Sequence, residues 1–309
     1  MMSSETDRIS IPYYTNTYDD RGADLSMFIQ DFYQDMVPVH GSDYEFIHCE
    51  LEPENVKFNE IIHELFPSND YTYKKNLNDI VLTTLQLVAQ YLVYSGRLVF
   101  ELVTRKDIDG RIDYKLEIVH GEEVKIVGDK IIQVMHRDAV EQLGISEPIV
   151  VPAEKCFVIE FPKSLGGREG YLKYLEDFKK IEDQNPMMNY FKNPLVEQVG
   201  YVLKEHQRLF ELELWRKSKV FNWHHRESRS DLFSRYYQIY RRLQFRKSKI
   251  ILRDYIIVQL TEIVDNISTK LGCKTELKIE GLISLERIDE ELRKWKAGES
   301  VHGKINEVL

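Results

Sequence analysis

The sequence predicts an α+β protein in which a central antiparallel β module is followed by long helices in the C-terminal half. Two observations support this fold class, and a third excludes two kinds of site. Residues 97–161 alternate β-branched, aromatic and polar side chains, and Asp109-Gly110 lies where a tight hairpin turn is expected. On either side of this region, apolar residues recur every three or four positions, which indicates helices. The three cysteines are far apart in the chain, so neither a disulfide framework nor a cysteine zinc site is expected.

The N-terminal part is predicted to contribute little regular structure. Residues 1–40 are polar and aromatic with weak periodicity, so we expect an irregular arm with one short helix at Asp24–Met36. A second helix is predicted at Asn59–Phe66, ended by Pro67. The first residues lack the apolar run of a signal peptide, and the longest apolar-rich segment, 80–93, is too short to span a bilayer. We therefore expect a soluble protein that is made inside the cell.

The middle of the chain has the clearest boundaries. An apolar stripe predicts a helix from Asn76 to Tyr94, with Asn76 or Asn78 as its N-cap and Gly96 as its end. The β module that follows should contain about five strands, with a second turn at Gly128-Asp129, and it ends at Pro162.

The C-terminal half is predicted to be mostly helical. Its expected elements are helices at Glu169–Glu182, Leu195 to about Lys219 and Ser230 to about Leu271, a strand at Thr275–Ile279, and a helix at Ser284–Lys296. We expect the long third helix to break near Lys247, and Gly272 and Gly298 to end helices. These elements group into four segments, which are residues 1–75, 76–165, 166–271 and 272–309.

Charge is distributed unevenly along the chain. Between Arg216 and Arg253 there are twelve Lys or Arg residues and two acids, a net charge of +10. The whole chain carries −9, so the remainder carries −19. Such an asymmetry suggests that surfaces of opposite sign contact either a polyanion or another copy of the chain.

The possible catalytic groups give no specific enzyme signature. His224 and His225 lie near Glu227, and a metal-dependent hydrolase at this pair is one alternative function. Adjacent positions on a helix point about 100° apart, however, so the two imidazoles are poorly placed to share one metal ion. The glycines at 166–170 have neither the spacing of a P-loop nor that of a dinucleotide-binding loop. We therefore expect no enzymatic activity and no cofactor.

The basic, aromatic-rich segment is the strongest candidate for a contact surface. Arg235, Arg242, Arg246 and Lys249 are spaced by seven, four and three residues, which predicts one helical stripe. Basic side chains neutralise phosphates and aromatic rings stack on bases, so sequence-independent nucleic-acid binding is a second alternative function. Two other interpretations stay open, which are a solvated helix face paired with acids of other helices and an acidic protein partner such as a neighbouring subunit. The candidate contact residues are Arg226, Arg229, Arg235, Arg241, Arg242, Arg246, Lys247 and Lys249.

The order of these elements resembles the portal proteins of tailed bacteriophages. YLVYSGRLVFELVTRKDIDGRIDYKLEIV at 91–119 is similar to the entry into their β-rich wing, where a helix, a glycine, an apolar strand and an Asp-x-x-Gly hairpin follow one another. VVPAEKCFVIEFPKSLGGREGYLKYLEDFKKI at 150–181 resembles the strand and glycine turn that lead into a stem helix. TELKIEGLISLERIDEELRKWKAGES at 275–300 is similar to their closing strand and helix. The resemblance covers roughly residues 76–300.

The resemblance implies a structural protein of the virion that has no catalytic activity. Portal proteins form a homo-oligomeric ring of about a dozen copies at one capsid vertex, with double-stranded DNA in the channel. The expected partners are the terminase motor, the capsid and head-completion proteins, and no membrane. The protein would lie in the host cytoplasm during assembly and in the virion afterwards. Residues 195–219 and 230–271 would supply stem and tunnel helices, and residues 222–231 a reduced clip. An acidic face of one subunit would then meet a basic face of the next.

Overall fold

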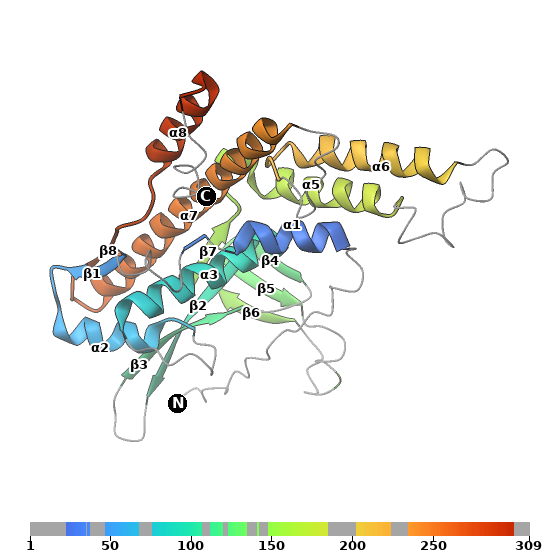
Figure 1. Ribbon diagram of the computed structural model, residues 1–309. Helices are drawn as coiled ribbons and strands as arrows, with labels where there is room; N and C mark the ends of the chain where they lie inside the picture. The colour runs from blue at the N-terminus through green and yellow to red at the C-terminus, as the bar shows by residue number, and fades with distance from the viewer. Residues whose placement is uncertain are drawn as a thin grey trace.

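The computed structural model describes residues 23–34, 36–37, 47–67, 76–106, 112–119, 123–134, 141, 148–184, 202–223 and 234–299. Within these ranges the protein combines long helices with small antiparallel sheets, which confirms the predicted mixture of α and β structure. In Figure 1, α5 and α6 lie above the sheet of β4, β5 and β6, α7 runs diagonally from α6 down to β1 and β8, and α3 lies beside β2.

The elements have the following bounds. The helices are α1 (Ala23–Tyr33), α2 (Val56–Leu65), α3 (Leu77–Ser95), α5 (Gly167–Glu182), α6 (Leu203–Ser218), α7 (Arg235–Lys270) and α8 (Leu285–Ala297). The strands are β1 (His48–Glu52), β2 (Arg97–Lys106), β3 (Ile112–Ile118), β4 (Glu123–Val127), β5 (Lys130–Val134), β6 (Ile149–Pro152), β7 (Cys156–Glu160) and β8 (Glu276–Glu280).

The ends of α3 confirm the boundaries expected from the sequence. The Asn76 side chain accepts a hydrogen bond from the Asp79 backbone N–H at 2.9 Å, as an N-cap does. Gly96 has a φ of 70°, a conformation that favours glycine, and its N–H returns to the Leu92 carbonyl. Asn78 is not the cap: its side chain accepts from the Cys49 N–H and donates to the Ile47 carbonyl, which ties β1 to α3.

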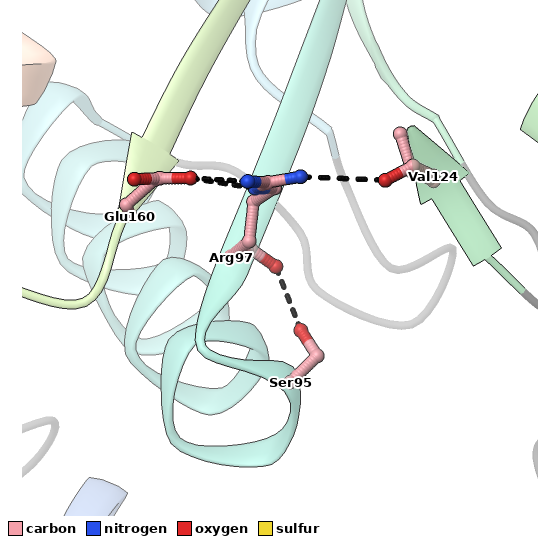
Figure 2. A network of polar contacts seen from close by, with 4 residues as sticks. All are labelled: Ser95, Arg97, Val124 and Glu160. Carbon is pink, nitrogen blue, oxygen red and sulfur yellow. Dashed lines mark hydrogen bonds and ion pairs between the residues drawn. The ribbon is translucent and has the colours of Figure 1, made fainter. Parts of the chain in front are cut away.

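In the described parts of residues 97–161, the β module has six strands in two sheets, where about five strands were expected. Both sheets are antiparallel and three-stranded, with strand orders β3-β2-β7 and β4-β5-β6. Figure 2 shows Arg97 joining them: its guanidinium donates to the Glu160 carboxylate on β7 at 2.5 and 2.8 Å and to the Val124 carbonyl on β4 at 3.3 Å. The Ser95 hydroxyl donates to the Arg97 carbonyl, so the end of α3 belongs to the same network.

The short helix expected at Asp24–Met36 is confirmed as α1, and in the described part of residues 1–40 it belongs to the core, not to an irregular arm. The side chains of Leu25, Phe28, Ile29 and Phe32 are buried in the main core. Their spacing of three, one and three residues forms one helical face, which the sequence already contained. The two N–H groups at the start of the helix, those of Asp24 and Leu25, donate to the buried Glu182 carboxylate at 2.6 and 2.9 Å. The short helix is thus an integral part of the core.

The long helix α7 is continuous over 36 residues, so the predicted break near Lys247 is wrong. Neither glycine nor proline occurs within it, and apolar contacts line its whole length. The chain that follows runs back along α7. The Thr261 hydroxyl donates to the Leu277 carbonyl on β8, and Trp295 on α8 stacks on Tyr236 near the start of α7.

One main core joins the four segments predicted from the sequence. It includes Phe28 from the first segment, Leu85 from the second, Phe178 from the third and Leu277 from the fourth. A smaller cluster of buried apolar side chains packs between α7 and α8, and another lies between the two three-stranded sheets. The boundaries at residues 75, 165 and 271 therefore mark changes in secondary structure within one packed body.

Candidate nucleic-acid or subunit interface

The first half of α7 carries six of the eight predicted contact residues. The other two, Arg226 and Arg229, lie outside the described residues, as do His224 and His225 of the hydrolase alternative. The segment from Arg235 to Lys249 contains no acidic residue, so the start of α7 is a concentrated source of positive charge.

The predicted basic stripe begins at the surface and runs into the core. Arg235 and Arg242 are exposed, whereas Arg246 is half-buried and Lys249 is buried. The Lys249 ammonium lies 5.8 Å from the centre of the Phe245 ring. Of these four side chains, only those of Arg235 and Arg242 are therefore fully available to a partner.

Lys247 holds two helices of the same chain together. Its ammonium lies 2.5 Å from the Asp289 carboxylate on α8. Ion pairs elsewhere in the basic segment also engage other residues of the chain, since Lys217 on α6 contacts the Asp177 carboxylate on α5 at 2.7 Å. Much of the local positive charge thus serves contacts between helices.

Arg241 is a correction to the predicted set, because its side chain is completely buried and cannot reach a partner at the surface. Its Nη2 donates to the Ser218 hydroxyl at 3.0 Å and to the Trp223 carbonyl at 2.5 Å. The guanidinium carbon lies 3.9 Å from the centre of the Trp215 ring, a cation–π geometry. Arg241 therefore anchors the end of α6 to α7.

The charge of Arg241 has no carboxylate partner among the described residues. Its Nε and Nη1 atoms are buried without hydrogen bonds, and so is the hydroxyl of the neighbouring Tyr174. Burial lowers the pKa of Arg241 to about 10, so the side chain remains charged at neutral pH. Burial also raises the pKa of Tyr174, which keeps its hydroxyl neutral. An uncompensated buried cation is costly, and that cost offsets part of the anchoring energy.

We expect Arg241→Met to change the free energy of unfolding by less than about 1 kcal/mol, because removing a buried unpaired charge compensates for two lost hydrogen bonds. Ser218→Ala leaves the charge in place with one acceptor fewer and should cost about 1.5 kcal/mol. Urea unfolding of both variants measures the difference. A loss larger for Arg241→Met than for Ser218→Ala would contradict a cost of burying the charge.

An aromatic contact at the same end of α7 was missed from the sequence. The rings of Tyr236 and Trp295 are stacked with centres 5.0 Å apart, and each side chain donates to the backbone carbonyl of the other residue at 3.2 Å. Tyr236 nevertheless remains about half exposed. The two residues are 59 positions apart in the chain, so local sequence patterns do not predict that they meet. The one signal was a tryptophan on the apolar face of the helix at 284–296.

The described part of the chain offers neither a metal-ligating cluster nor a membrane-spanning helix. No group of three or more His, Cys, Asp or Glu side chains is arranged there to hold a metal ion. None of the helices in the described ranges is both long and apolar enough to cross a membrane.

Comparisons with known proteins identify no relative. The sequence matches no protein-family model, and no curated protein or solved structure is significantly similar to it.

Proposed function

We propose that this protein is a portal-like structural protein that assembles into a ring through which DNA is packaged and ejected at a capsid vertex. The observation that supports the proposal best is the order of three structural parts. A module of antiparallel sheets is followed by the helices α5 and α6, which lie side by side and extend away from the β1–β8 end (Figure 1). The 36-residue helix α7 then runs back to that end. Wing, stem and tunnel elements follow this order in the family that the sequence resembles.

The surface of α6 gives a physical reason for assembly. Val202, Leu203, Leu209 and Val220 lie along this helix or directly beside its ends, and all four are exposed to 40% or more. Burying these side chains against a neighbouring copy would remove apolar surface from water and so favour association. The exposed ion pairs Glu205–Arg208 and Glu213–Arg216 lie along the same helix and help to keep the free subunit in solution before a ring forms.

Native mass measurement and negative-stain microscopy of the purified protein test the proposal. We expect closed rings of one stoichiometry, whose formation strengthens as protein concentration rises. A protein that remains monomeric at high concentration, including in the presence of its capsid partners, would contradict it.

We expect Leu209→Lys to weaken the association of neighbouring copies about tenfold, because burying this leucine in a contact contributes about 1.5 kcal/mol that a lysine cannot supply. Sedimentation velocity over a range of concentrations measures the effect. Lys204→Gln on the same helix is the matched control and should assemble as the wild type does, since its side chain is exposed and polar. Equal association of both variants would exclude this face of α6 from the subunit contact.

A further inference from the structure

The beginning of α7 presents two guanidinium groups that lack a partner in the described residues. Arg235 and Arg242 are both exposed, and neither contacts a carboxylate within these ranges. They are seven residues apart, so they point to the same side of the helix, separated by about 10 Å along its axis. We call this pair the basic stripe.

The two-stranded sheet of β1 and β8 presents the opposite charge. Its outer face consists of three cross-strand pairs, which are His48 with Glu280, Glu50 with Lys278, and Glu52 with Glu276. All six side chains are exposed, while Leu51 and Leu277 point into the core. Four carboxylates against one lysine give this face, which we call the acidic ribbon, a net negative charge.

The acidic ribbon keeps like charges in an unfavourable arrangement. Glu52 and Glu276 face each other directly across the two strands, and like charges in such a pair destabilise a sheet. The ion pair of Lys278 with Glu52 relieves only part of this repulsion. Cations supplied from outside the chain would relieve the remainder.

The basic stripe and the acidic ribbon of one chain cannot meet. The hydrogen bond from Thr261 to Leu277 places β8 beside the second half of α7, about 20 residues beyond Arg242 and thus about 30 Å away along the helix. In Figure 1, β1 and β8 lie at the end of α7 that is far from α6. A contact between the two surfaces therefore requires two copies of the protein.

The dimensions of the two surfaces also agree. The carboxylates at the two ends of the ribbon, at Glu276 and Glu280, are four residues apart on one strand, which corresponds to about 13 Å. Arginine side chains spaced by about 10 Å along a helix can span this distance, because each carries a long, flexible aliphatic stem.

We propose that the basic stripe of one copy docks on the acidic ribbon of the next copy. The inference rests on the proposed ring and assigns one of its subunit contacts. Since the two surfaces differ, the contact is heterologous, and repetition of such a contact generates a ring when its rotation closes. Exposed ion pairs contribute little affinity individually but set orientation and the rate of encounter, so assembly weakens as salt rises.

Charge reversal tests the docking. The stripe variant carries Arg235→Glu and Arg242→Glu, and the ribbon variant carries Glu276→Lys and Glu280→Lys. Both pairs of positions are exposed, and Glu276→Lys removes the repulsion with Glu52, so each monomer should fold, which circular dichroism checks. We expect each variant alone to associate about a hundredfold more weakly than the wild type at low salt, because like charges then face each other.

Mixing the two variants is the decisive arm of the experiment. One variant has two acidic surfaces and the other two basic surfaces, so an equimolar mixture should recover assembly with alternating copies. Lys130→Glu with Lys155→Glu is the control for the stripe variant, because it changes net charge equally at exposed positions of the β module. We expect this control to assemble normally.

The outcomes separate the inference from the function that it rests on. Rings formed by both reversed variants, as readily as by the wild type, would overturn the docking and leave the ring intact. The docking is also overturned if the stripe variant still forms rings but no longer binds a labelled DNA duplex. The basic stripe would then face nucleic acid. A wild-type protein that never forms rings contradicts the proposed function and, with it, the assigned contact.

Discussion

Phe28→Ala is expected to lower the free energy of unfolding by about 4 kcal/mol, the range found for removing a fully buried phenylalanine. The Phe28 ring is completely buried, and it lies 5.3 to 5.9 Å from the centres of five other aromatic rings. These neighbours come from α1 itself, from α5 and from the segment after α6. They are Phe32, Tyr174, Phe178, Phe221 and Trp223. Truncation therefore opens a cavity where three parts of the chain meet.

Chemical denaturation of the variant measures this effect. Ser26→Ala on the same helix is the matched control, since Ser26 is only partly buried, and should change stability by less than about 0.5 kcal/mol. If Phe28→Ala costs no more than the control, α1 is not part of the core, and its packing would have to be reconsidered.

The second large effect is a pH dependence centred on Glu182. Burial raises the pKa of this carboxyl to about 7 from its ordinary 4.5, although the N–H groups of Asp24 and Leu25 oppose the shift. The nearby Asp24 and Asp183 raise it further. The folded protein therefore retains a proton between pH 4.5 and 7 that the unfolded chain has released. The stabilising contribution is full below pH 4.5 and is lost as pH rises to 7, a change of about 3 kcal/mol.

Glu182→Gln removes the titrating group and keeps an acceptor for the start of α1. We expect the stability of the variant relative to the wild type to increase by about 3 kcal/mol between pH 4.5 and pH 8. Urea unfolding at a series of pH values measures the difference. Glu176→Gln is the matched control on the same helix, because this carboxylate is exposed at the surface, and it should show no such increase. A difference independent of pH at position 182 would rule out the proposed titration.

Local signals in the sequence defined much of the fold. Asn76 and Gly96 marked the ends of α3, and Ser284 and Gly298 those of α8, because capping depends on residues within one turn of the helix end. The break expected near Lys247 was wrong, because α7 is one helix from Arg235 to Lys270. The ion pair between Lys247 and Asp289 on α8 instead holds this part of α7 against the neighbouring helix.

The candidate interface was less accessible to sequence reasoning. Periodicity placed Arg235, Arg242 and Lys249 on one stripe, but it contained no information on where α7 enters the core. Arg241 belongs to the interior because Ser218 and Trp223, far from it in the sequence, meet its guanidinium. The acidic ribbon depends on the pairing of β1 with β8, two strands more than 220 residues apart in the chain.

The continuity of α7 has a mechanical consequence. A helix of 36 residues is about 54 Å long, and without glycine or proline it has no built-in hinge. Its two ends are attached to different parts of the molecule, α6 through Arg241 and the β1–β8 sheet through Thr261. A displacement of the α6 end is therefore transmitted along this rigid helix to the β1–β8 sheet at its other end.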